Sequence, residues 1–438
     1  MKKFMSQPTL LLFTLIMMFT SCSQLMNERT LKYEELPLLA NEQDSFCSED
    51  KGASLANQNR EAFKIFLDFL PKARAAHPLS SIDEFVLWTL FQMNLRPDAT
   101  TPRSRFQALI TIKNETRYFD ITIQNDNEKK AAPTLFALKT LLEVYGSAHS
   151  LERLAGLHDR LLPPAIPIGP KMALILKDHQ KEIMNHEQLK KIYFRVGHPL
   201  LAGETIPRLK LLPLVQKFRS LIQKADLYRV QNHLFIDETS TPEKGPVQTS
   251  CNFDLNIYRH DIHLVTRENH EYAHPFLMTK RNGDHFLATT AQLTFDGKKK
   301  ILPLEETSLF QGIPSPYPMA MCQIKSAVAN LHLISTKGRD TAQQIFQLIN
   351  NDVGQSTDLA TLSEKIARYR YMTLYNPKRL VYETHRLDSQ QTQAIRSLKL
   401  PIYHAPSIGN IWGHGKFSSG QSGLIIDPRN HGAISCQK

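Results

Sequence analysis

The chain lacks the features that would identify a membrane protein or a familiar enzyme class. Beyond its first 22 residues it has no apolar run of the ~20 residues that a membrane-spanning helix needs. It has no block of like charge, which argues against a polybasic tail, and no internal repeat. A serine-hydrolase elbow and a glycine-rich phosphate loop are also absent. Because of these absences, no familiar motif identifies a reaction for this folded chain.

Cysteine is scarce, with five residues in 438. If Cys22 is modified, the even number that remains makes two disulfides plausible in an oxidising compartment. The simplest pairing joins Cys251 to Cys322 and Cys47 to Cys436, while Cys47 with Cys251 and Cys322 with Cys436 is nearly as possible. Four unpaired buried thiols are the alternative. The spacings are too long for zinc-type pairs, and we predict no metal and no cofactor.

The first 22 residues have the pattern of an export signal. Lys2 and Lys3 precede an apolar run from Leu10 to Phe19, and the small residues Thr20 and Ser21 follow it. The run is too short to cross a bilayer as a helix, but it has the length of a signal-peptide core. We therefore expect residues 1–21 to be a signal peptide.

The segment Phe19-Thr20-Ser21-Cys22 resembles the lipobox of bacterial lipoproteins, although the family prefers Leu where Phe19 stands. The resemblance implies that Cys22 is lipidated and becomes the first residue of the mature chain. Because Ser23 follows, it also implies a lipid anchor in the outer membrane of the cell envelope. An ordinary cleaved signal peptide with a passive Cys22 is the alternative.

The composition is that of a folded globular protein, with 42% hydrophobic and 22% charged residues. Without the two leader lysines, the body has 51 basic against 42 acidic side chains. This diffuse positive charge favours weak association with an anionic envelope component, and no specific nucleic acid is predicted. Solubility and genome composition explain the excess equally well.

The pattern of apolar residues predicts an α+β fold. Residues 22–52 read as a lipidated tether, and residues 53–232 as a mainly helical domain with a β-hairpin between Phe106 and Gln124. A helix from Arg60 is expected to end at Pro71, and Ser81 with Glu84 forms a predicted capping box. Residues 233–325 are β-rich and residues 326–438 read as α/β, so 233–438 could also be one domain.

His270-Glu271-Tyr272-Ala273-His274 fits the zinc-protease pattern of two histidines one helical turn apart. Pro275 directly follows and pushes the second histidine out of the α region, and the flanks are strand-like. We therefore predict a polar loop between strands, and the same reading covers three neighbouring residues, His260, Asp261 and His263.

The C-terminal stretch Gly413-His414-Gly415-Lys416-Phe417 follows alternating strands and helices from Asn330 onward. This order resembles the phospholipase D superfamily, which implies that His414 attacks phosphorus while Lys416 neutralises the phosphate oxygens. The sequence departs from that pattern because Gln421 stands where the family has an aspartate. The only second half-site places Gln231 where the nucleophile belongs.

The leading hypothesis is therefore an envelope-anchored lipoprotein with a binding or structural role and an unknown partner. A phospholipase D-like phosphodiesterase, either active or inactive, is the alternative. A caspase-type pairing of His414 with Cys436 is disfavoured because the chain ends where a core strand is needed. Whether the protein is an enzyme, its ligand and its oligomeric state stay open.

Overall fold

The computed structural model describes most of the chain after residue 44. The described residues are 45–48, 54–124, 131–235, 247–255, 273–293, 302–303, 310–311, 313–315, 318–336, 341–374, 379–383, 393, 395, 397, 401–405, 407–429 and 432–436. They form two compact units. The larger unit lies within Leu38–Ala367 and Gly409–Lys438, and the smaller one contains Arg368–Ile408.

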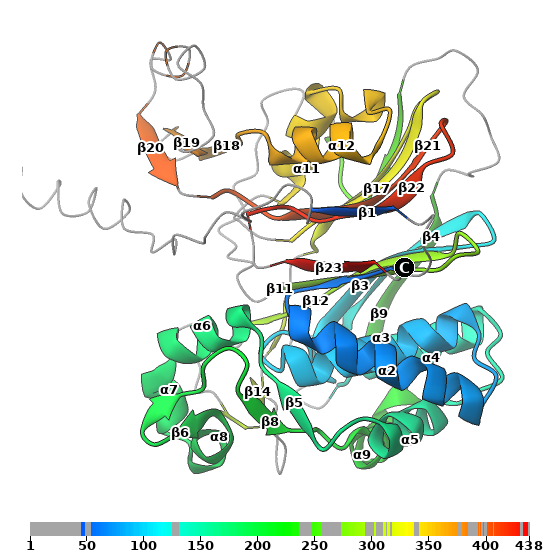
Figure 1. Cartoon of the computed structure of the whole chain (residues 1–438), viewed down its shortest axis with the longest axis vertical. Coiled ribbons are helices and arrows are strands. Elements are labelled where there is room, and N and C mark those ends of the chain that lie inside the picture. Colours follow the sequence, from blue (N-terminus) through cyan, green and yellow to red (C-terminus); the bar gives the residue numbers. More distant parts are fainter. Residues whose placement is uncertain are drawn as a thin grey trace, which may run out of the picture. The chain divides into compact units, whose positions relative to one another are not determined.

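Two antiparallel sheets face each other in the larger unit, as Figure 1 shows. The eight-stranded sheet has the order β23 (Ala433–Cys436), β2 (Ser54–Asn57), β11 (Ala273–Thr279), β12 (His285–Leu293), β3 (Arg105–Ile112), β4 (Glu115–Ile123) and β9 (Tyr228–Leu234), with β15 (Ile313–Pro314) beside β12. The six-stranded sheet has the order β1 (Phe46–Ser48), β22 (Ser422–Ile425), β21 (Ile411–Phe417), β17 (Ala329–Ser335), β16 (Ala320–Lys325) and β10 (Gln248–Cys251).

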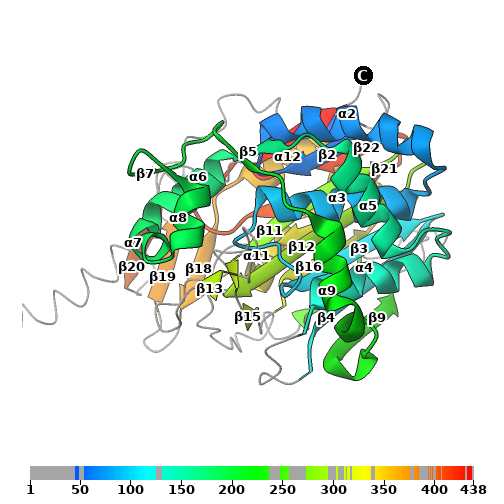
Figure 2. The same cartoon turned by 90° about the horizontal axis from the view of Figure 1, so that it is seen from below.

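Helices cover the outer faces of both sheets, which makes a four-layer sandwich. The helices α2 (Arg60–Ala76), α3 (Ser81–Leu95), α4 (Pro133–Val144), α5 (Leu151–Leu161) and α9 (Leu211–Ile222) lie across the eight-stranded sheet, seen from below in Figure 2. The helices α11 (Thr341–Asn350) and α12 (Leu359–Ala367) pack on the six-stranded sheet. The fold class is α+β.

The period of two along each strand separates the cores. On β11, Phe276 and Met278 belong to the core beneath the helices, whereas Leu277 belongs to the core between the sheets. Strands of the opposite sheet contribute Ile334 and Trp412 to this second core. Every strand near the middle of the sandwich is therefore buried on both faces, and its side chains alternate between two different environments.

Short elements complete the larger unit. The helices α6 (Pro170–Asp178), α7 (Gln180–Met184) and α8 (Glu187–Tyr193) share a small core, and the pairs β5 (Ala165–Pro167) with β8 (Thr205–Pro207) and β6 (Phe194–Arg195) with β7 (His198–Pro199) lie beside them in sequence. The sequence predicts one continuous helical stretch over residues 171–193. The structure breaks it where His179 and His186 leave the helical conformation.

Two helix boundaries differ from the prediction. Helix α2 continues past Pro71 to Ala76, because the side chains on its buried face, such as Phe66 and Ala73, keep it packed on both sides of the proline. Helix α3 is capped by Ser80 rather than Ser81. Its capping box pairs Ser80 with Asp83, one residue earlier than the predicted box.

Two disulfides join the four cysteines that follow Cys22. The bond between Cys47 and Cys436 links β1 of one sheet to β23 of the other, across 389 residues of sequence. The bond between Cys251 and Cys322 joins directly opposed positions of β10 and β16 in one sheet. This is the first of the two pairings that the sequence leaves open.

The smaller unit has a three-stranded sheet in the order β18 (Tyr371–Leu374), β19 (Arg379–Glu383) and β20 (Ile402–Ala405), of which the last two are parallel. Its buried carboxylate Glu383 accepts hydrogen bonds from the backbone N–H groups of Arg370 and Ile408, at 3.0 and 2.6 Å. In the part of the chain that the structure describes, no helix is both long and apolar enough to cross a membrane.

Candidate functional site

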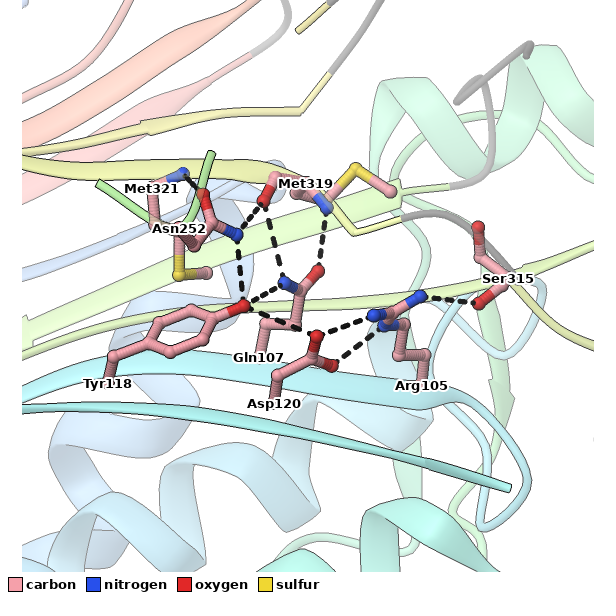
Figure 3. A network of polar contacts seen from close by, with 8 residues as sticks. All are labelled: Arg105, Gln107, Tyr118, Asp120, Asn252, Ser315, Met319 and Met321. Atoms are coloured by element: carbon pink, nitrogen blue, oxygen red, sulfur yellow. Dashed lines mark hydrogen bonds and ion pairs between the residues drawn. The ribbon is translucent and has the colours of Figure 1, made fainter. Parts of the chain in front are cut away.

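A network of buried polar groups connects the two sheets at the end where β11 begins and β3 starts (Figure 3). We call it the inter-sheet network, and it consists of Arg105, Gln107, Tyr118, Asp120 and Asn252 with the backbones of Ser315, Met319 and Met321. Its ion pair joins Arg105 to Asp120 through two parallel hydrogen bonds, with Nε 2.8 Å from Oδ1. The guanidinium also donates to the carbonyl oxygen of Ser315.

The centre of the inter-sheet network is the hydroxyl of Tyr118. It accepts hydrogen bonds from the side-chain amides of Gln107, at 2.8 Å, and Asn252, at 2.9 Å. It lies 3.3 Å from Asp120 Oδ2, to which it donates. Burial raises the pKa of Tyr118, and the nearby carboxylate of Asp120 raises it further, so the phenol stays protonated.

Gln107 of the eight-stranded sheet reaches the backbone beside β16 of the opposite sheet, whereas Asn252, which follows β10, holds that backbone from within its own sheet and crosses to Tyr118. The N–H of Met319 donates to Gln107 Oε1 at 2.7 Å, and Asn252 Nδ2 donates to the carbonyl oxygen of Met319 at 2.7 Å. The N–H of Met321 donates to Asn252 Oδ1 at 2.8 Å. The network therefore fixes the spacing of the sheets at this end.

Thr289 stands in the same cross-strand row as Gln107 and Asp120. Gln107 is the register partner of Thr289 on one side and of Asp120 on the other. The hydroxyl of Thr289 is buried, and among the described residues its Oγ1 has no hydrogen-bond partner. A buried hydroxyl without a partner is unusual in a native fold, and such a group is a candidate for a catalytic role.

The first described residue of β11 carries no reactive group. Ala273 packs with Ala291 and Met319 in a small apolar cluster between the sheets. Its neighbour His274 faces the helices, where its ring nitrogens lie 3.2 Å from Gln58 Oε1 and 2.9 Å from Gln92 Oε1. Burial lowers the pKa of His274 well below its usual value, and it is therefore neutral at pH 7.

The position of His274 shows that the zinc-protease pattern is not realised at its second histidine. His274 lies in a β-strand and not in a loop or a helix, so the one-turn spacing that this pattern requires is not formed at its second histidine. His270 and Glu271 lie outside the described residues, and so do the three neighbours at 260, 261 and 263.

Three histidines meet between the sheets at the other end of β3. His285 at the start of β12 faces His332 of β17 and His414 of β21, and all three are buried. The Nε2 atom of His285 is 2.9 Å from Nδ1 of His332, and the rings of His285 and His414 are stacked with centroids 3.8 Å apart. We call these residues the histidine cluster.

The predicted pair His414 and Lys416 lies on one face of β21, but only His414 is inside the protein. Its side chain is 1% exposed, whereas Lys416 is exposed at the strand end. The flanking glycines have a packing role, since a Cβ at Gly413 would lie 2.6 Å from the carbonyl oxygen of His332. The Gly-His-Gly stretch is therefore the middle of a buried strand.

The described surface also has a cavity of about 200 Å³ on the helical layer. It is lined by α4, α5, α9 and the loops beside them, and none of its lining residues belongs to a sheet. Ion pairs such as Lys139 with Glu143 border it. It does not reach either the inter-sheet network or the histidine cluster.

No family model matches this chain, and no curated protein matches it in sequence. Solved structures do match its fold. A structure of LmbA2991HD has a TM-score of 0.62 at 10% identity and covers 91% of this chain and 100% of that chain. The cephalosporin acylase from Bacillus halodurans has a TM-score of 0.60 at 10% identity and covers 92% of this chain and 98% of that chain. The fold of this chain is therefore similar to that of these two solved structures.

These similarities correct what the sequence suggested about family and function. The phospholipase D resemblance is wrong, because the strands around His414 form an antiparallel sheet inside a four-layer sandwich similar to an acylase. The recognition as a bacterial lipoprotein and the expected binding or structural role are likewise overturned by the similarity in fold to solved structures such as the cephalosporin acylase. Cys22 and the leader lie outside the described residues.

Sequence reasoning missed both buried clusters. Their members come from strands that are distant in the sequence, and no spacing rule joins Arg105 to Asn252 or His285 to His414. The one available signal was the alternation within the Arg105-Phe106-Gln107 stretch, where polar residues recur every second position in an otherwise apolar strand.

Proposed function

We propose that this chain is an acylase-type enzyme, which cleaves an amide bond of its substrate and passes the acyl group to water or to an amine. The observation that carries the proposal is the similarity in fold to cephalosporin acylase over 92% of this chain and 98% of that chain. A match of this extent supports a shared architecture around the reaction site. The substrate follows from side chains and not from the fold.

The proposed reaction site is the inter-sheet network together with Thr289. Acyl transfer needs a nucleophile, hydrogen-bond donors for the developing oxyanion and a site shielded from water. The row across the sheet contains the hydroxyl of Thr289 and the amide of Gln107. Arg105, paired with Asp120, adds a guanidinium at the same strand end, suited to a carboxylate on the acyl group.

In the proposed step, Thr289 Oγ1 attacks the amide carbonyl carbon. A C–O bond to the threonine forms, the C–N bond breaks, and the hydroxyl proton leaves with the amine. Water then hydrolyses the ester and restores the hydroxyl. Because the side chain of Thr289 is 1% exposed, substrate entry requires a local opening of the layer between the sheets.

We also propose that the protein works outside the cytoplasm. Support comes from the two disulfides, which persist in oxidising compartments, and from the export pattern of residues 1–21. The envelope location, lipidation of Cys22 and contact with an anionic envelope component stay predictions.

The test uses the tag-free body of the protein and chromogenic amides with aliphatic, arylacetyl and dicarboxylic acyl groups. We expect amine release with at least one substrate, and Thr289→Ala should lower it by about 10³-fold or more, as loss of a nucleophile does. Thr289→Ser keeps a hydroxyl and should retain part of the activity. Thr89→Ala, which removes a buried hydroxyl bonded to the carbonyl of Phe85 within α3, is the matched control.

Trapping the acyl-enzyme with an activated ester and mapping the labelled peptide locates the nucleophile independently. A label on another residue would reject Thr289 and keep the enzyme class. Absence of both turnover and labelling across the panel would reject the class.

A further inference from the structure

The histidine cluster combines residues of both sheets in the layer between them. His285 comes from the eight-stranded sheet, and the directly opposed pair His332 and His414 comes from the six-stranded sheet. One ring nitrogen of each lies within 4.8 Å of a ring nitrogen of the other two. Three buried imidazoles at this distance are rare without a reason, because each removes a polar ring from water.

We propose that the histidine cluster is a binding site for a divalent transition-metal ion, of which zinc is the expected occupant, and that the ion joins the two sheets. Neutral imidazole is a good ligand for zinc, copper and nickel, and three histidines with a water complete a tetrahedral zinc shell. This inference does not rest on the proposed amide hydrolysis, since the cluster lies at the other end of β3 from the inter-sheet network.

The distances suit a small ion. Around tetrahedral zinc with bonds of ~2.0–2.1 Å, ligand nitrogens lie about 3.3 to 3.4 Å apart. The printed pair of His285 Nε2 and His332 Nδ1 is at 2.9 Å, so these atoms need to separate by a few tenths of an ångström. The stacked rings of His285 and His414 must tilt so that their in-plane lone pairs converge on one point.

Groups behind two of the rings prepare the ligand tautomers. The Nδ1 atom of His285 lies 3.1 Å from the carbonyl oxygen of Gly283, which can only accept, so the proton is on Nδ1 and the lone pair is on Nε2. The Nε2 atom of His332 lies 3.4 Å from the hydroxyl of Thr116, which can donate or accept. In the metal-free cluster His332 Nδ1 donates to His285 Nε2, and on metal binding the His332 proton moves to Nε2, where Thr116 accepts it, which leaves a lone pair on Nδ1 as metal-bound histidines usually have.

The protonation states agree with this geometry. Burial lowers the pKa of His285 and of His332 well below the usual value, which favours the neutral rings that bind a cation.

The neighbouring disulfide shows what the site would do. In the six-stranded sheet, Cys47 is the register partner of Leu424, which is in turn the partner of His414. In the eight-stranded sheet, the row of register partners runs from Cys436 through β2 and Thr279 to His285. Covalent bond and metal would thus clamp the same ends of the two sheets side by side. We expect the metal to stabilise the sandwich, since its ligands come from both halves.

The experiment measures zinc in tag-free protein, stripped with a chelator and dialysed against zinc chloride, by elemental analysis. We expect one zinc ion per chain and a higher melting temperature than in the stripped protein. Cobalt chloride is the second probe, because cobalt in a tetrahedral nitrogen site gives a visible absorption spectrum that loosely bound cobalt lacks.

His332→Asn and His414→Asn should each abolish stoichiometric zinc and the cobalt spectrum. Thr116→Val, which leaves all three ligands, should weaken zinc binding by about 10- to 100-fold, as loss of a group that orients a ligand does. His158→Asn is the matched control, because His158 is an equally buried histidine of α5 outside the cluster.

Circular dichroism of the stripped variants separates loss of binding from loss of folding. Stripped wild-type protein that takes up neither zinc nor cobalt would overturn the proposal, and so would stoichiometric zinc binding in the folded His332 and His414 variants. If both variants fail to fold, the wild-type cobalt spectrum decides alone.

Discussion

The chemical environment of a single residue in this protein depends on which face of its strand the residue occupies. Ala273 and His274 are neighbours on β11, yet the first lies between the sheets and the second lies under the helices. His274 is fully buried there with Gln58 and Gln92 at its two ring nitrogens. Such a ring is a neutral hydrogen-bonding group of the core, and it costs the fold stability only when it must be protonated.

That cost predicts an acid-sensitive fold. Burial, with a smaller effect of Arg96, lowers the pKa of His274 well below the ~6.5 of an unfolded chain. Below pH 6.5 the unfolded chain therefore binds a proton that the native state does not bind. The contribution to stability is present above this pH and is lost as the pH falls, by about 1.4 kcal/mol per pH unit for each such histidine.

Urea unfolding in a chelator, at several pH values between 7.5 and 5, measures this slope. His274→Gln removes the titrating group and should flatten the slope by about 1.4 kcal/mol per unit. Gln92→Met removes only a hydrogen-bond partner, so it should lower stability at every pH without changing the slope. Equal slopes in wild type and His274→Gln would contradict the buried neutral state.

At the scale of elements, local signals located the helices well and their ends less well. The predicted hairpin is present as β3 and β4, because Lys113 and Asn114 adopt the left-handed conformation that a tight two-residue turn requires. The cap of α3 shifted by one residue, since Ser81 is needed elsewhere and donates to Asp284 at 2.6 Å. Two serines in succession gave the same local signal.

The position of this cap is testable. Ser80→Ala should lower the unfolding free energy by about 1 kcal/mol, because the hydroxyl of Ser80 accepts from the backbone N–H of Asp83. Ser80→Asn keeps a capping acceptor and should restore most of it. The measurement is chemical denaturation of the three proteins at one pH, and equal stability of wild type and Ser80→Ala would place the cap elsewhere.

At the scale of the whole molecule, the disulfides differ in what they hold together. Cys47–Cys436 closes 389 residues and joins two sheets, while Cys251–Cys322 closes 71 residues within one sheet. In the chain-entropy model the constraint on the unfolded state grows with the logarithm of this separation. The longer bridge should therefore contribute about 1.5 kcal/mol more to the unfolding free energy.

Paired Cys→Ser variants test this difference. Removing Cys47 and Cys436 together should cost more stability than removing Cys251 and Cys322 together, with each cost in the usual range of about 2 to 4 kcal/mol or somewhat above. Non-reducing peptide mapping of the wild type establishes the pairing first. A larger loss from the shorter bridge would contradict the assignment of the sheet-joining role.

The sequence by itself determined the α+β class and most of the secondary structure that is described between Arg60 and His404. Those features depend on local spacing, so apolar periodicity, turn residues and caps were enough to find them. After Asn330 the predicted elements match β17, α11, α12, β19 and β20, although β18 was not predicted and the family assignment was wrong. Similar local orders occur in unrelated folds, and only strand pairing distinguishes them.

The tertiary structure decided which strands face each other, and with that every candidate site. The polar side chains at every second position of β3 could be recognised as part of a site only because the opposite sheet places Asn252 beside Tyr118. His414 changed from an isolated strand histidine to a member of a cluster because the sandwich placed His285 against it. Contacts between residues that are more than a hundred positions apart have no local signature, so neither site could be read from the chain alone.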